Sequence, residues 1–574
     1  MIQFYRVDGD DDRIAKQPRE LLFKGYVMQG ITIALALLAM VVVSGTVTRI
    51  LPIAVPLPLI QIGLGMLIAV VTGTAVELDP SIFFLLFLPP LLFLDGWRIP
   101  KEGLLHDKGV ILELALGLVL FTVLGVGIFI HWMIPSVPLP VAFALAAILS
   151  PTDPIAVSAI SARVPIPKRL MHILEGESLL NDASGLVCMR FAVAAAVTGA
   201  FSVGDAVATF LWLALGGIAI GVGLTWAVTR TRDLVSRKLG EDTGSHILIS
   251  LLIPFCAYLA AEHFHCSGIL AAVAAGITMS FVERRGRALA ITRVRTQTVW
   301  DTVQFAMNGM VFVLLGQQFP SIASSAASVV GETGHGHTIW LIFYVVAITA
   351  ALVVMRLTWV WISLRFTLFR AARRGQVIRT PSWRLVVATS LAGVRGAITL
   401  AGILTLPLVL DDGSAFPARE LAIFLAAGVI ITSLVLASVF LPFLLKDLDL
   451  PPEPTHRQEE DAARIAAAEA AIKAIQTAQH QMGAGRNDAD FYSEVGARLM
   501  ELYRERIDGR SKTGDEAEQV QRMEDIERAL RLSAVRAERD AILGLARARK
   551  LPEATATTLV REIDLLEARL VSST

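Results

Sequence analysis

The sequence is poor in charged residues and in cysteine. Only 18% of its 574 residues are Asp, Glu, Lys or Arg, whereas a soluble domain has about 25%. Its three cysteines, Cys188, Cys256 and Cys266, are scattered through apolar sequence, so they form neither a disulfide framework nor a metal-ligand spacing. The formal net charge is zero and says nothing about partners. We expect no cofactor and no nucleic-acid partner.

We also expect no cleavable signal peptide, because the first apolar stretch is too long and has no small-residue cleavage site. What the sequence has instead is a series of apolar runs, each close to the ~20 residues that a helix needs to cross a bilayer. This pattern predicts an all-α polytopic membrane protein with about thirteen transmembrane helices. We expect them near 26–47, 57–76, 81–97, 109–134, 138–162, 170–199, 205–229, 246–263, 267–283, 299–319, 338–364, 384–408 and 420–445.

Basic residues alternate between the loops of this predicted bundle. The loops after the odd-numbered spans carry them, as in Arg98 after span three, Arg232 after span seven and Arg370 after span eleven. The other loops are nearly free of Lys and Arg, with Arg419 as the clear exception. Because Lys and Arg collect on the cytoplasmic side, we predict an odd number of spans and a cytoplasmic C-terminus.

The predicted domains are an N-terminal extension (1–25), a transmembrane domain (26–447) and a cytoplasmic helical domain (448–574). The extension fits poorly, because it carries five basic residues although the alternation places it outside. Our hypothesis is that it is not translated and that the chain starts at Met28. The C-terminal domain is rich in Ala, Glu and Arg, with apolar residues at helical spacing. We interpret it as a helical hairpin or short coiled coil; a regulatory tail is the alternative.

Ionisable residues inside apolar spans are costly in lipid and therefore mark functional sites. In span five, Thr152 and Asp153 lie between Pro151 and Pro154. Proline removes a backbone donor, and unwound helices with free carbonyls form the midplane ion sites of many transporters. We expect Asp153 to supply charge and Thr152 to supply oxygen, unless Asp153 only caps the lower half of a kinked helix.

Span six carries a second polar group. At about 100° per residue, Glu177, Ser178, Asn181 and Asp182 fall within one sector of the helix of about 140°. Two carboxylates, a hydroxyl and an amide on one face provide the oxygen ligands that hard cations prefer. The sequence therefore predicts a cation site on this face.

Span twelve carries the buried Arg395 between Gly393 and Gly396. It is too deep to extend to the surface, so we expect it to pair with Glu177 or Asp182 and to play a structural role. Arg190 and Arg356 also lie in apolar stretches, and we assign them no role. The cluster at 262–266 matches no zinc motif, so we expect no metal site beyond that of the transported cation.

These motifs resemble those of the monovalent cation/proton antiporter-1 family, in its bacterial sodium/proton antiporter form. The resemblance covers residues 28–445 and rests on Phe-Leu-Pro-Pro-Leu-Leu-Phe at 87–93, Ser-Pro-Thr-Asp at 150–153, Gly-Glu-Ser-Leu-Leu-Asn-Asp at 176–182 and Gly-Val-Arg-Gly-Ala at 393–397. It implies a homodimer in the bacterial inner (plasma) membrane, built from inverted repeats. It also implies two discontinuous crossing helices, which we expect in span five and in a span near Asn308.

The resemblance implies roles for the polar residues. Asp182 corresponds to the central ion- and proton-binding carboxylate, and Asn181 to a position that is Asp in electrogenic relatives. Glu177 and Arg395 correspond to a structural ion pair of the core. The further ligands are Asp153, the backbone of Thr152, and Ser178.

One position departs from the family pattern. Many relatives carry Glu directly after the 87–93 motif, where this chain has Leu94 followed by Asp95. A shift of one residue turns a side chain by about 100° on a helix. We expect Asp95 to substitute through local unwinding near Pro89 and Pro90, or else the ligand to be absent.

The function that these expectations support is electroneutral antiport of one Na⁺ (or Li⁺) for one H⁺ by alternating access, for Na⁺ extrusion and intracellular pH regulation. A desolvated carboxylate that is costly to leave ionised and empty holds either a proton or a cation, and this competition couples the two fluxes. Asn181 beside Asp182 leaves one titrating carboxylate there, which predicts the 1:1 ratio. A K⁺/H⁺ or broad-specificity antiporter is the alternative. A channel would show filter repeats or charged pore rings, and an enzyme a recognisable catalytic motif; the sequence shows neither.

Overall fold

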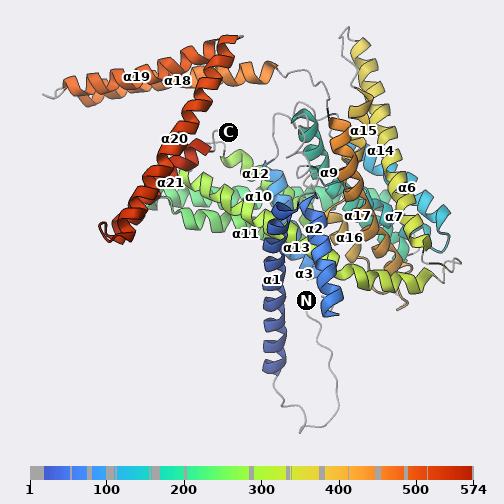
Figure 1. The fold of residues 1–574 in the computed structure, drawn as a ribbon. Coiled ribbons are helices and arrows are strands. Elements are labelled where there is room, and N and C mark those ends of the chain that lie inside the picture. The colour runs from blue at the N-terminus through green and yellow to red at the C-terminus, as the bar shows by residue number, and fades with distance from the viewer. Residues whose placement is uncertain are drawn as a thin grey trace. The chain divides into compact units, whose positions relative to one another are not determined.

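The computed structural model is all-helical and divides into two compact units, Met1–Leu448 and Asp449–Thr574 (Figure 1). The predicted N-terminal extension lies outside the described residues up to position 18, and the first helix begins at Arg19. The structure describes residues 19–51, 55–73, 80–98, 109, 113–153, 157, 168–198, 203–283, 290–330, 337, 339–373, 382–410, 413–446, 454–483, 489–512 and 515–571.

Each of the predicted apolar stretches overlaps a helix of the first unit or, for 384–408, a pair of helices. Eight of the described helices are long and apolar enough to cross a membrane; the number thirteen stays a prediction. The helices are α1 (Arg19–Ile50), α2 (Leu57–Thr72), α3 (Pro80–Arg98), the π-helical turn η1 (Glu113–Leu118) with α6 (Val119–Met133), α7 (Leu139–Leu149), α9 (Lys168–Thr198), α10 (Val203–Leu239), α11 (Thr243–His263), α12 (Gly268–Glu283), α13 (Ala290–Val330), α14 (Ile339–Arg373), α15 (Trp383–Leu391), α16 (Ala397–Leu404) and α17 (Arg419–Leu445).

The outer surface of this unit is apolar. Large hydrophobic side chains such as Val42, Val71 and Trp132 are 66%, 76% and 75% exposed. Contiguous apolar surface on this scale is rare in water-soluble monomers, whereas lipid tails solvate it without cost. The exposed apolar faces therefore agree with a helical bundle that lies in a bilayer.

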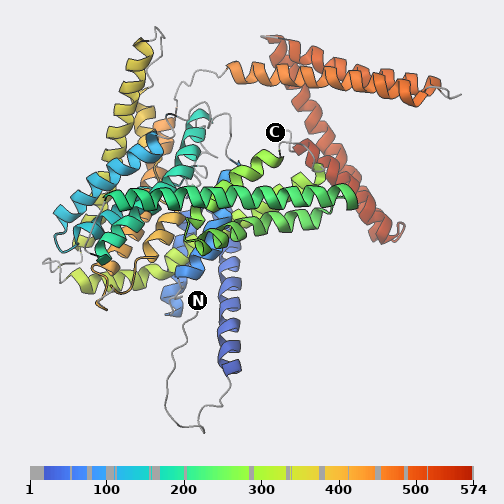
Figure 2. The same ribbon diagram turned by 180° about the vertical axis from the view of Figure 1, so that it is seen from behind.

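Glycines let two pairs of helices approach backbone to backbone. A Cβ at Gly65 of α2 would overlap the carbonyl group of Val313 of α13, and one at Gly276 of α12 would overlap the carbonyl group of Phe93 of α3. Small residues at helix contacts are the usual means of tight packing in membranes. These contacts hold α13 on α2 and α3 on α12. Figure 2 shows α10 as a long helix that also packs against α11 and α12.

Two helix breaks meet inside the bundle. Helix α7 ends at Leu149 and the chain runs non-helically to Asp153, while α15 and α16 are separated by the non-helical residues 392–396. The backbone N–H of Asp153 donates to the carbonyl oxygen of Val394 at 2.7 Å. The free backbone groups of one break are thus partly satisfied by the other.

This arrangement corrects two expectations. The partner of the break after α7 is the α15–α16 break and not a span near Asn308, because Asn308 lies inside α13, which is continuous from Ala290 to Val330. Likewise, α3 is continuous through Pro89 and Pro90, so no local unwinding occurs there.

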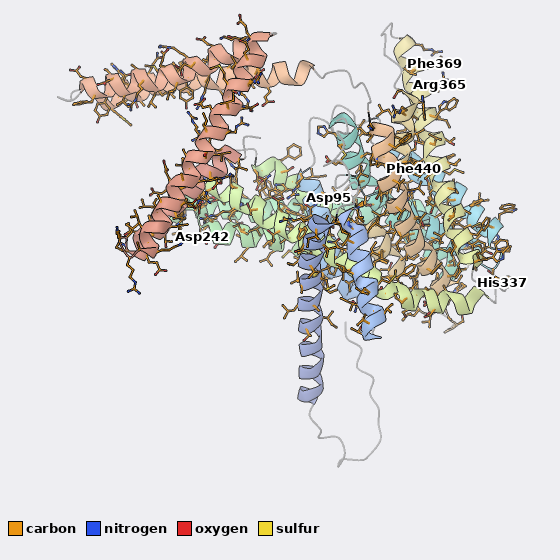
Figure 3. The ribbon with its side chains drawn as sticks, in the orientation of Figure 1. Asp95, Asp242, His337, Arg365, Phe369 and Phe440 are labelled. Carbon is orange, nitrogen blue, oxygen red and sulfur yellow. The ribbon has the colours of Figure 1, made fainter. Side chains whose placement is uncertain are left out.

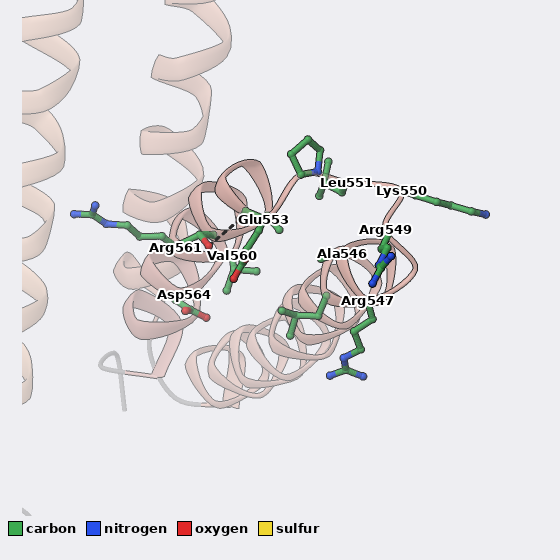
Figure 4. A pocket seen from close by; sticks show the side chains of 13 residues that line it. Ala546, Arg547, Arg549, Lys550, Leu551, Glu553, Val560, Arg561 and Asp564 are labelled. Atoms are coloured by element: carbon green, nitrogen blue, oxygen red, sulfur yellow. Dashed lines mark hydrogen bonds between the residues drawn. The ribbon is translucent and has the colours of Figure 1, made fainter.

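The second unit consists of two antiparallel helix pairs, α18 (Pro454–Gly483) with α19 (Ala489–Ser511) and α20 (Asp515–Arg547) with α21 (Glu553–Val571). Few of its apolar side chains are buried. Figure 4 shows the turn between α20 and α21, where the basic side chains of Arg547 and Lys550 project in different directions and do not converge on one point. Among the described residues of the second unit, the buried hydrophobic ones are Ala468, Val535, Ala556 and Ile563.

Candidate functional site

A small cavity lies where the two helix breaks meet. Thr152 and Asp153 of the first break line it on one side, and Gly396 and Thr399 at the start of α16 on another. The space open to the centres of water-sized molecules is about 20 Å³, which suffices for about one water. A single monovalent cation that has shed most of its water needs a site of this scale.

Three carboxylates line this one cavity: Asp95 from α3, Asp153 from the break and Asp182 from α9. Asp182 is only 3% exposed. Within the described part of the chain, no hydrogen bond joins the carboxylate of Asp95 or Asp182 to another side chain. Like charges repel strongly in a medium of low dielectric constant, so a cation or a proton among these groups relieves a large unfavourable interaction.

Asp95 therefore reaches the cavity from a regular helix. The one-residue offset from the family pattern does not remove the carboxylate from the cavity. Figure 3 labels Asp95 within the bundle, near α2 and α3. The sequence left open whether this residue lies at the site, and the structure shows that it does.

Neutral oxygen atoms complete the lining. Ser178 lies one helical turn before Asp182 on the same face of α9, and Asn308 contributes its amide from α13. Hard cations prefer several oxygen ligands of this kind. The sequence interpretation missed Asn308 and Thr399 as site residues. Two features of the sequence could have indicated them: Asn308 is a lone amide in the middle of an apolar span, and Thr399 carries a hydroxyl three residues after Gly396.

Behind the cavity, hydrogen bonds link three buried side chains. The Asn181 amide donates to the Thr152 hydroxyl oxygen at 3.0 Å, and that hydroxyl donates to Glu177 at 3.4 Å. Asn181 does not line the cavity, although the sequence placed it among the ion ligands. In this structure it positions Thr152 instead.

Glu177 forms its ion pair with Arg356 and not with Arg395. The Arg356 guanidinium binds both carboxylate oxygens, with Nη2 to Oε2 at 2.7 Å, and its Nε donates to the Thr389 carbonyl oxygen at 3.2 Å. Glu177 is fully buried and Arg356 is 2% exposed, so each neutralises the other. The predicted Glu177–Arg395 pair was therefore wrong in its partner, and Arg356, to which the sequence assigned no role, takes that place.

The guanidinium of Arg395 binds backbone carbonyl groups. Its Nε donates to the Leu149 carbonyl oxygen at 2.8 Å, its Nη1 donates to the Gly393 carbonyl oxygen, and its backbone N–H donates to Ser433. A helix that ends inside the bundle leaves carbonyl oxygens without intrahelical partners. These free carbonyls satisfy the guanidinium without a carboxylate, which is why the expected ion pair does not form.

Gly396 allows the closest contact between the two breaks. A Cβ at this position would overlap the carboxylate of Asp153. Only a residue without a side chain lets Asp153 occupy its place in the cavity. The glycine beside Arg395 is thus part of the geometry of the site.

Comparison with known proteins identifies the family. The family model for the transmembrane sodium/hydrogen exchanger matches residues 33–447. The uncharacterized Na⁺/H⁺ exchanger YjcE of Escherichia coli is 42% identical over 92% of this chain and 96% of its own length. The sodium, potassium, lithium and rubidium/H⁺ antiporter of Bacillus subtilis is 40% identical over 93% of this chain and 77% of its own.

The fold agrees with these matches. The solved structure of the sodium proton antiporter MjNhaP1 from Methanocaldococcus jannaschii superposes with a TM-score of 0.56 at 17% sequence identity, covering 74% of this chain and 99% of that one. The all-helical fold and the antiporter resemblance predicted from the sequence are confirmed. This multi-pass membrane protein is a transporter and not an enzyme, and it belongs to the sodium/hydrogen exchanger family.

Proposed function

We propose that the protein exchanges one Na⁺ (or Li⁺) for one H⁺ by alternating access, with the cavity around Asp182 as the shared site. The observation that carries this proposal is the meeting of Asp95, Asp153 and Asp182 at one small cavity where two helix breaks cross. Such an exchanger, driven by a proton gradient, extrudes Na⁺ and regulates the internal pH.

The coupling follows from electrostatics. Several carboxylates left ionised and empty in a dry site are costly. A cation bound to their oxygens relieves the cost, and so does a proton on Asp182, but the two compete for the same oxygens. The site therefore changes its exposure from one side to the other only when it is occupied, which makes the two fluxes obligatorily opposite.

The residues that line the cavity come from two groups of helices. A relative movement of these groups would provide alternating access. Asp95 and Asn308 come from α3 and α13, which pack tightly on α12 and α2 through glycines. Thr152, Asp153 and Asp182 come from the break after α7 and from α9, which also pack together, as Gly185 lies against Pro151. Movement of one group past the other would open the cavity to either side while each group keeps its own ligands.

The 1:1 ratio rests on the neutrality of the surrounding residues. Asn181 carries no charge, and the charge of Glu177 is compensated by Arg356. Neither residue then contributes a proton to the cycle, and we assign the exchanged proton to Asp182. Asp95 and Asp153 act as further oxygen ligands whose protonation does not change over the cycle.

The test is proton flux in proteoliposomes driven by a Na⁺ gradient. Asp182→Asn should abolish the flux, whereas Glu501→Gln, which removes an exposed carboxylate of α19, should leave it unchanged. Clamping the membrane potential at zero should not alter the initial rate of the parent protein. Residual exchange by Asp182→Asn would refute the site, and a rate that follows the potential would refute the 1:1 ratio.

A broader cation range is the second candidate. The Bacillus subtilis relative, whose name includes potassium, lithium and rubidium, covers nearly the whole chain. Oxygen ligands such as those of Ser178 and Asn308 serve either Na⁺ or K⁺. A screen of proton flux with Na⁺, Li⁺, K⁺ and Rb⁺ separates the two candidates, since comparable rates with K⁺ would favour the broader range.

We also propose a homodimer in the bacterial plasma membrane, with the C-terminal unit in the cytoplasm. The alternation of basic loops supports this orientation. Protease added to sealed right-side-out vesicles should leave the C-terminal unit intact and should remove it once the vesicles are opened. Chemical cross-linking in native membranes should give a band at twice the monomer mass.

A further inference from the structure

A second and larger groove lies far along the chain from the cation cavity, where α10 ends and α11 begins. It encloses about 920 Å³ and is lined by both helices and by the turn between them, which contains Asp242 (Figure 3). This volume is in the range of sites that bind small organic molecules. The transport mechanism proposed above makes no use of it.

The groove lies at the level where a membrane helix leaves the lipid tails. Helix α10 has 37 residues and is therefore about 55 Å long, which exceeds the ~30 Å of the hydrocarbon core. Between Asp205 and Arg230 its sequence has no charged residue, so a crossing of ~20 residues ends near Arg230. The basic residues that follow, among them Arg232 and Arg237, fall at the level of the lipid headgroups.

The Asp, Glu and Arg residues of the lining all lie at or beyond Arg232, toward the turn. Ala227, Val228 and Ile249 line the part of the groove nearest the membrane-spanning stretches, whereas Arg237 and Glu241 line the part nearest the turn, together with apolar side chains such as Leu239. A phospholipid has the same order of chemistry along its length, with acyl chains in the hydrocarbon region and a charged headgroup outside it.

The charges of the lining are of both signs. Arg232 is held by Asp233 at 3.1 Å and by the ring nitrogens of the buried His246 at 3.2 Å. Beyond these three residues the lining holds one cation, Arg237, and two carboxylates, Glu241 and Asp242. The Oε1 atom of Glu241 lies 3.9 Å from Nδ1 of His246.

Asp242 is held as an anion. Hydrogen bonds from the hydroxyl and backbone N–H of Ser245 and from the backbone N–H of Gly244 lower the pKa of the Asp242 carboxyl. The headgroup end of the groove therefore carries a negative excess and a separate positive group.

We propose that this groove binds an aminophospholipid of the phosphatidylethanolamine type. Arg237 pairs with the phosphate, assisted by the hydroxyl group of Ser236, and the primary ammonium donates to Glu241 and Asp242. The acyl chains run along Val228 and Ile249. A phosphatidylglycerol headgroup has no cation for the two carboxylates, and the choline headgroup has no N–H to donate to them.

The difference between ethanolamine and choline headgroups makes the proposal testable. The full-length protein would be purified with a limiting amount of mixed lipid of identical acyl chains, and the lipids retained would be measured by native mass spectrometry. We expect phosphatidylethanolamine to be retained about tenfold better than phosphatidylcholine or phosphatidylglycerol, the ratio that one charge-assisted hydrogen bond supplies. Equal retention of the three lipids, or a preference for phosphatidylglycerol, would overturn the proposal.

Variants of residues that line the groove test whether the lipid preference arises there. Glu241→Gln should remove the preference for ethanolamine over choline, while Glu241→Asp should keep part of it. Arg237→Gln should weaken retention of both zwitterionic lipids, and its matched control is Lys238→Gln, which changes an exposed neighbour that does not line the groove. The same loss in the Lys238 variant would show that general surface charge, and not this groove, binds the lipid. Unchanged melting temperatures would establish that the variants fold.

Competition with water-soluble glycerophosphoethanolamine tests whether the ligand is a membrane lipid or a free metabolite. It carries the same phosphate and ammonium but no acyl chains, so we expect it not to displace the lipid even at a hundredfold excess. Displacement at equal concentration would mean that the groove takes its ligand from solution, which would overturn the assignment to a lipid.

Discussion

The buried ion pair of the first unit has different surroundings from the exposed pairs within single helices of the second. In the first unit, the side chains of Glu177 and Arg356 are 1% and 3% exposed and bind each other through two oxygens. In the second, Arg464 and Glu460 form a pair one helical turn apart whose side chains are 55% and 58% exposed. The pairs Arg504–Glu501 and Arg531–Glu527 have the same character.

The physical consequence of an ion pair depends on this difference. A buried pair stabilises little compared with an apolar substitute, but the removal of one partner strands a charge in a medium of low dielectric constant. An exposed pair contributes little because water and salt screen both charges. The buried pair of the first unit therefore holds helices in position, and the exposed pairs within α18, α19 and α20 mainly keep those helices soluble.

The largest expected effect is the loss of one buried partner. Arg356→Gln leaves Glu177 ionised without a counter-charge, and we expect a loss of about 3–5 kcal/mol in the free energy of unfolding. The melting temperature of the purified protein in detergent checks this. The double variant Glu177→Gln/Arg356→Gln removes both charges and should recover a large part of the loss. If the double variant were as unstable as the single one, the pair would not be the reason.

The next effect concerns the position of a charge and not its presence. Gly396→Ala keeps every carboxylate of the cavity but forces Asp153 out of its place, because the added methyl group would overlap it. We expect Na⁺-driven proton flux to fall about a hundredfold, as displacements of about 1 Å have such effects on reactive sites. Gly63→Ala is the matched control, since nothing lies within 4 Å of a Cβ there. Near-normal flux in Gly396→Ala would argue against Asp153 as a ligand.

Much of the first unit could be predicted from the sequence, because apolar runs and polar residues within them have few explanations in a lipid environment. Asp153, Ser178 and Asp182 were placed at one site, and the structure brings them to one cavity. Helical periodicity sufficed for Ser178 and Asp182, which lie on one face of α9.

The partners across helices could not be predicted in the same way. A guanidinium in an apolar span requires acceptors, but the sequence does not say whether these are carboxylates or the free carbonyls of a broken helix. In the structure, the Arg395 guanidinium binds carbonyl oxygens and the Arg356 guanidinium binds the Glu177 carboxylate. Similarly, a single amide such as Asn308 gives no pattern of its own, and only the packing of α13 brings it to the cavity.

A smaller effect is expected from this neutral ligand. Asn308→Ala removes one amide oxygen but no charge, so we expect the Na⁺ concentration for half-maximal flux to rise about tenfold while the maximal rate stays within about twofold. The same measurement with Li⁺ and K⁺ would show whether Asn308 selects among cations. Asn308→Asp adds a fourth carboxylate and tests the 1:1 ratio, because flux should then respond to membrane potential. Unchanged half-saturation in Asn308→Ala would remove this residue from the set of ligands.

The smallest effect is expected for an exposed ion pair of the second unit. Arg464→Gln breaks an exposed pair in the second unit, and we expect a change of no more than about 0.5 kcal/mol in stability and none in transport. The change should also vanish at high salt, since screening already weakens such a pair. A marked loss of transport from Arg464→Gln would show that the charges of α18 do more than solubilise a helix. The second unit would then be coupled to the cation site, and the regulatory tail considered from the sequence would replace the structural interpretation.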